Sequence, residues 1–140
     1  MFNLINKTNN MKKLLFILLA TFSLNAVAQS KIKKLPSDFY SVKWISSNEE
    51  MDATRDYMTY RKEGSREFPI ARFRATYTFG TDGSCKWLKL EPNDLQNIVD
   101  GKFEFNRRKQ TIKIFDEKGT LVQTFRVVGI DKDVLKLKNL

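Results

Sequence analysis

The chain has 140 residues, 41% hydrophobic and 29% charged, which is typical of one folded domain and argues against disorder. It contains no histidine, which excludes Ser-His-Asp and Cys-His catalysis and histidine zinc sites. Its single cysteine, Cys85, excludes an intramolecular disulfide and a thiolate metal cluster. We therefore expect no catalytic residue, no metal and no other cofactor.

The first 28 residues have the features of a secretory signal peptide. Lys12 and Lys13 precede the apolar run 14–24, and Ala26-Val27-Ala28 gives a small-residue cleavage pattern. The apolar run is shorter than the ~20 residues that a membrane-spanning helix needs. The alternative is a buried N-terminal helix of the fold.

Cleavage after Ala28 would leave a single domain, residues 29–140, in the periplasm or secreted, with no transmembrane segment. Met11 is an alternative start of the chain. Removal of Lys7, Lys12 and Lys13 would lower the formal net charge from +9 to +6. A positive domain is attracted to anionic surfaces such as lipid headgroups or polysaccharide.

The remaining residues predict an all-β domain. After a basic lead that contains Lys31, Lys33 and Lys34, the apolar and alternating segments predict about eight short strands. The predicted strands span residues 39–45, 56–62, 72–79, 84–90, 98–105, 111–115, 120–128 and 134–140. The segment 72–79 is the clearest, because Phe73, Ala75, Tyr77 and Phe79 alternate with polar residues.

The connections predict tight turns. Ser47 and Glu50 have the spacing of a capping box, so 46–54 is either a single helical turn or a polar loop. Asp82-Gly83 predicts a hairpin turn, and Gly101 predicts a bulge or bend within its strand. Sequential strands joined by such turns predict an antiparallel meander, and closure into a barrel would protect its edges. A two-sheet sandwich is the alternative.

Several motifs in 68–138 resemble small exported lipocalin-like domains of bacteria. These are FRATYTFGTDGSCKWLKLEPND, GKFEF, TIKIFDEKG and TFRVVGIDKDVLKLK. The resemblance implies a lipocalin-like barrel with an opening at one end, and it implies no assigned activity. One departure is that Val42 and Lys43 precede Trp44, where larger lipocalins place a glycine two residues before the tryptophan. The mature chain is also shorter than those of larger lipocalins.

Aromatic and basic residues are the candidate ligand-binding groups. The proposed residues are Trp44, Tyr57, Tyr60, Tyr77, Trp87, Arg72 and Arg74. The rings would line a pocket or, alternatively, fill a small core. We expect Phe73, Tyr77, Phe79, Phe103 and Phe125 to meet in one dry interior.

The basic residues as a group have two possible roles, and so does Cys85. Arg66, Arg72 and Arg74, with the hairpin tip 107–109, form either an anion-binding patch or a solvated charged face. Cys85 is either a buried apolar residue or the source of an intermolecular disulfide.

Two functions are compatible with these features. The first is a non-enzymatic binding module for a small apolar or amphipathic ligand, held in an aromatic cavity. The second is an envelope interaction protein with a filled core and a basic face for an anionic surface. Export argues against a nucleic acid partner. A solid interior would favour the second function.

Overall fold

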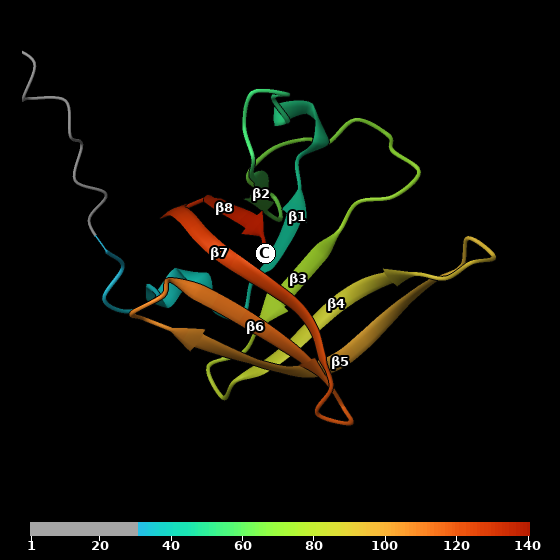
Figure 1. Ribbon diagram of the computed structural model, residues 1–140. Coiled ribbons are helices and arrows are strands. Elements are labelled where there is room, and N and C mark those ends of the chain that lie inside the picture. The colour runs from blue at the N-terminus through green and yellow to red at the C-terminus, as the bar shows by residue number, and fades with distance from the viewer. Residues whose placement is uncertain (1–30) are drawn as a thin grey trace, which may run out of the picture. The chain divides into compact units, whose positions relative to one another are not determined.

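The computed structural model describes residues 31–140, which form a closed barrel of eight antiparallel strands (Figure 1). The strands are β1 (Lys43–Ser46), β2 (Met58–Lys62), β3 (Thr76–Phe79), β4 (Ser84–Leu90), β5 (Gln96–Asn106), β6 (Thr111–Asp116), β7 (Leu121–Asp131) and β8 (Val134–Asn139). Short 3-10 helices precede and follow β1, namely η1 (Ser37–Phe39) and η2 (Asn48–Glu50). The predicted all-β class and closed barrel are confirmed.

The strand order follows the sequence except at one place. Strands β3 to β8 form an antiparallel meander, as predicted. The β1–β2 hairpin closes the barrel in reversed order, since β2 pairs with β8 and β1 pairs with β3. The connection between β2 and β3, residues 63–75, therefore has to pass β1, and we call it the crossover segment.

Inward-facing side chains fill the barrel. The buried apolar residues are Leu35, Phe39, Trp44, Tyr60, Phe79, Cys85, Ile112, Ile114, Phe125, Val127, Leu135 and Leu137. Four of the five rings expected in the interior are found there. Phe79 and Phe125 are buried, and Tyr77 and Phe103 pack against the core. Ring centroids of Phe79 and Phe103 lie 4.9 Å apart.

The prediction for Phe73 is wrong. Strand β3 begins only at Thr76, and Phe73 lies in the crossover segment, outside the core cluster. The alternation in the sequence continues before Thr76, but there only the Ala75 carbonyl oxygen still pairs with β1, by accepting a hydrogen bond from Ser46 N. The Arg74 side chain donates hydrogen bonds to the carbonyl oxygens of Pro69 and Ser46.

One end of the barrel is closed by the chain that precedes β1. Leu35 and Phe39 are buried there, and the Phe39 ring stacks on Phe79 with centroids 4.7 Å apart. Trp44 fixes this plug, because its Nε1 donates a hydrogen bond of 3.0 Å to the Phe39 carbonyl oxygen. We call this the closed end of the barrel.

Two predictions about glycines have different outcomes. Gly83 adopts φ +85° in the hairpin turn between β3 and β4, as expected. Gly101 forms no bulge, since its pairings with Cys85 and Asp116 keep the register. The register shifts instead in β6–β7 and β7–β8.

Gly101 is required by close packing instead. A Cβ atom at this position would lie 2.1 Å from the Phe115 carbonyl oxygen and 2.8 Å from the Trp87 ring. The neighbouring strand backbone and the indole therefore occupy the space of a side chain.

The predicted signal peptide and the cleavage site after Ala28 lie outside the described residues. No helix within residues 31–140 has the length and apolar content to span a bilayer.

We predict that Gly101→Ala lowers the free energy of unfolding by about 3 kcal/mol, because the strand and Trp87 have to move. Urea denaturation of the purified protein measures this loss. Gly129→Ala is the matched control, since a Cβ there would meet only Lys136 Cδ, at 3.7 Å. Equal losses in the two variants would refute the packing argument.

Candidate functional site

The predicted aromatic site residues lie in three environments. Trp44 and Tyr60 are fully buried, at 0% and 3% exposure. Tyr77 and Trp87 point inward and are partly exposed. Tyr57 is separate from them, with its ring 5.5 Å from the Lys136 Nζ and 5.8 Å from the Arg55 guanidinium. The structure thus brings Tyr60 and Tyr77 together, with centroids 5.7 Å apart, and leaves Tyr57 out.

The titratable groups of the interior are held neutral. Burial raises the pKa of the Tyr77 hydroxyl to about 12 and that of the Tyr60 hydroxyl further. Burial also raises the pKa of the Cys85 thiol to about 12, and Cys85 is 1% exposed. A thiol of this kind is a poor nucleophile near neutral pH, because the thiolate is the reactive form. Cys85 therefore acts as a small buried residue.

Three hollows are described within residues 31–140, and none is lined by the five aromatic site residues. The largest, of about 500 Å³, lies at the β6–β7 hairpin and is lined in part by Asp82, Lys102, Glu104 and Asp116. No group of three carboxylate or cysteine side chains in this part of the chain could hold a metal ion.

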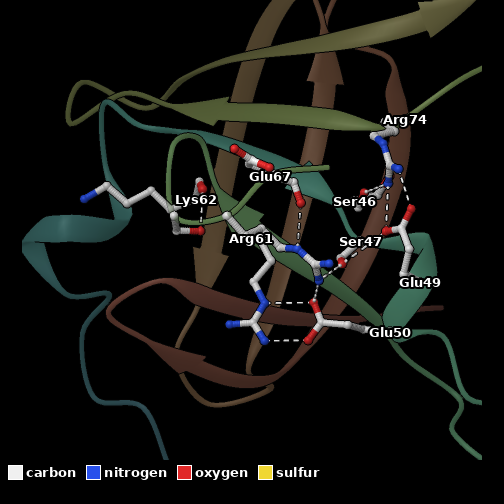
Figure 2. Close-up of polar contacts among 10 residues, drawn as sticks. Ser46, Ser47, Glu49, Glu50, Arg61, Lys62, Glu67 and Arg74 are labelled. Atoms are coloured by element: carbon white, nitrogen blue, oxygen red, sulfur yellow. Dashed lines mark hydrogen bonds and ion pairs between the residues drawn. The ribbon is translucent and has the colours of Figure 1, made fainter. Parts of the chain in front are cut away.

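Glutamates of η2 bind two arginines of the crossover segment, Arg66 and Arg74, and Arg61 of β2 (Figure 2). Arg61 donates to both carboxylate oxygens of Glu50, and Arg66 Nη1 lies 3.2 Å from the same group. Arg74 pairs with Glu49. We call these five residues the Arg–Glu network.

The Arg–Glu network fastens the crossover segment to η2. The Phe68 ring contacts two of the three arginines of the segment, at 5.6 Å from the Arg66 guanidinium and 5.1 Å from that of Arg74. The helical turn expected from Ser47 and Glu50 is present as η2, but Ser47 makes no capping hydrogen bond. Glu50 binds arginines instead, which the capping-box spacing could not indicate.

The predicted basic face of Arg66, Arg72 and Arg74 does not form. Arg66 and Arg74 are paired with η2, and Arg72, which is largely exposed, pairs with Asp94 on the β4–β5 hairpin. Their positive charges are therefore compensated within the domain.

A different basic cluster forms at the closed end. The Gln110 side chain bridges the basic lead and the β5–β6 hairpin, because its Oε1 accepts from Ile32 N and its Nε2 donates to Ile32 O, both at 2.9 Å. The bridge places the lead beside the hairpin tip, and the two segments carry six exposed cations, namely Lys31, Lys33, Lys34, Arg107, Arg108 and Lys109. We call them the basic end. The basic lead and the basic tip 107–109 can each be recognised in the sequence, but their proximity depends on the Gln110 side chain.

The Arg–Glu network predicts acid-sensitive stability. Hydrogen bonds from Arg74 and Arg61 lower the pKa values of Glu49 and Glu50 from 4.5 to about 2. Groups with a lowered pKa stabilise the fold above their unfolded pKa, and the contribution is lost as pH falls through the folded pKa. We therefore expect the urea concentration at the unfolding midpoint to decrease as the pH is lowered from 4.5 to 2.

Glu50→Gln should lower the midpoint at pH 6 and flatten this part of the profile. Glu117→Gln, on an exposed hairpin, is the control and should leave the profile unchanged. If the urea midpoint of Glu50→Gln decreased with pH as steeply as that of the wild type, the acid sensitivity would not come from the Arg–Glu network.

The fold and the surface of the domain are the only basis for a functional conclusion. Comparison of the chain with protein-family models, with curated proteins and with solved structures finds no match.

Proposed function

We propose that this chain is an exported, non-enzymatic interaction protein that binds an anionic partner of the cell envelope through its basic surface. The observation that carries this proposal is the basic end. Its six cations are exposed and make no ion pair within residues 31–140, whereas the arginines of the Arg–Glu network are all paired. Uncompensated charge on one surface attracts opposite charge over a distance of about a Debye length.

The interior supports the same proposal. Rings and aliphatic side chains occupy the barrel, and the described hollows lie away from the aromatic site residues. The neutral Cys85 thiol and the neutral Tyr60 and Tyr77 hydroxyls offer no group in the interior poised for acid–base or nucleophilic chemistry. A role at the surface fits these features better than a reaction in a pocket.

Binding to isolated envelopes tests the proposal. Processed protein purified from its own compartment should sediment with envelopes at 50 mM salt and be released at 500 mM salt, because the attraction is screened. Retention that is independent of salt, or no sedimentation at low salt, would contradict the proposal. An exported neutral protein of similar size serves as the control.

Binding of a small apolar ligand is the second candidate, and the positions of Tyr77 and Trp87 favour it. These inward-facing rings are partly exposed, unlike Trp44 and Tyr60. The resemblance to lipocalin-like domains, which we retain as a proposal, points the same way. The candidate requires that a ligand contact the two rings from one end of the barrel.

Native mass spectrometry of the processed protein tests this candidate. We expect a retained small molecule whose signal decreases in Trp87→Ala and persists in Tyr57→Ala, since Tyr57 lies apart from the interior. A spectrum of the unliganded mass alone would count against ligand binding.

A further inference from the structure

The basic end is held together by a built contact. Besides its two bonds to the Ile32 backbone, the Gln110 Nε2 donates to the Arg107 carbonyl oxygen at 2.5 Å. One amide thus joins the chain before η1 to a hairpin 78 residues away in sequence. The backbone of the lead at Ile32 is therefore fixed beside the tip 107–109, and three lysines flank Ile32 in the sequence.

The backbone of Gln110 is held as tightly as its side chain. Its φ is +55°, a left-handed conformation that is uncommon for a residue other than Gly, Asn or Asp. Its carbonyl oxygen accepts a 2.8 Å hydrogen bond from Val127 N on β7. The strained turn aims the amide at Ile32, so the arrangement of the cations is part of the fold.

The cations have nothing to neutralise them within the described chain. All six are exposed, and none forms an ion pair among residues 31–140. They line none of the three hollows described above. Such an arrangement suits a partner that presents many negative charges over an area.

We infer that the basic end docks on a lipid bilayer that carries anionic phospholipid headgroups, an inference that rests on the proposed function. The neighbouring side chains favour a bilayer over a soluble polyanion. Tyr40 follows η1 directly and is half-buried, with its ring edge-on to Phe39 at 5.2 Å. Ile32 lies between two lysines in the sequence, and both Ile32 and Tyr40 pack against the core and leave part of their surface exposed. Tyrosine and apolar groups beside lysines are typical of the membrane interface.

Co-sedimentation with vesicles tests the inference. Processed protein should bind vesicles of phosphatidylglycerol and phosphatidylcholine at 50 mM salt, and should not bind phosphatidylcholine alone. The triple variant Arg107→Gln, Arg108→Gln, Lys109→Gln should bind roughly tenfold or more weakly, since each cation near an anionic surface contributes severalfold. Its turn is retained, because Arg107 and Lys109 contribute backbone atoms to it.

A matched control separates position from net charge. The triple variant Lys102→Gln, Lys113→Gln, Lys118→Gln removes three exposed charges that also make no ion pair in the described chain. These positions lie on β5, on β6 and in the β6–β7 hairpin, outside the basic end. The vesicle affinity of this control variant should fall less than threefold. Equal losses in the two triple variants would overturn the assignment to the basic end.

Gln110→Asn tests the bridging contact. Asparagine tolerates the left-handed backbone but is one methylene too short to reach Ile32. We expect the Ile32 amide to lose protection from hydrogen exchange and vesicle affinity to fall severalfold. Lost protection with unchanged affinity would overturn the role of the bridge.

The two levels of the proposal can fail separately. If envelopes bind with salt dependence and anionic vesicles do not, the partner is an anionic polymer and only the bilayer inference falls. If the protein binds neither envelopes nor vesicles, both the bilayer inference and the proposed function are refuted. Thermal melts of each variant confirm that the barrel is intact.

Discussion

Closure of the barrel depends on the short β1–β2 hairpin. Strands β3 to β8 alone would be an open sheet with unpaired edges on β3 and β8, and the hairpin pairs with both. Its reversed placement obliges the crossover segment to pass β1, and the Arg–Glu network holds that segment. The buried Trp44 of β1 also binds the Phe39 plug, so the same hairpin seals the closed end.

This arrangement separates the cations of the described chain into compensated and free ones. Arg61, Arg66 and Arg74 are bound by glutamates and Arg72 by Asp94, so these arginines serve the fold. The cations of the basic end come from the chain before η1 and from a hairpin tip, where no described acidic side chain binds them. The net charge of the domain therefore does not show which cations are free to bind a partner, because many of them form ion pairs within the fold.

Much of the architecture was predictable because strand periodicity is local. Alternation and turn residues predict a strand at the place of each of the eight, and the Asp82-Gly83 turn is correct. The predicted start of the first strand at residue 39 is wrong, because Phe39 ends η1 as part of the buried plug and β1 begins at Lys43. The predicted start of β3 is wrong because the alternation begins at Phe73, in the crossover segment that precedes the strand. The bulge predicted at Gly101 is wrong because glycine is needed there for the close approach of the Phe115 carbonyl oxygen, which the residues next to Gly101 in the sequence do not reveal.

Composition and the two-residue period were enough to predict the eight strands, to exclude histidine chemistry and to place four of the five inward-facing rings. Which charges remain free depends on contacts between distant segments. Arg66, Arg72 and Arg74 alternate or cluster in the sequence, yet their partners come from η2 and the β4–β5 hairpin. The basic end likewise joins segments that only the Gln110 bridge brings together, because long-range contacts leave no periodic signal in the chain.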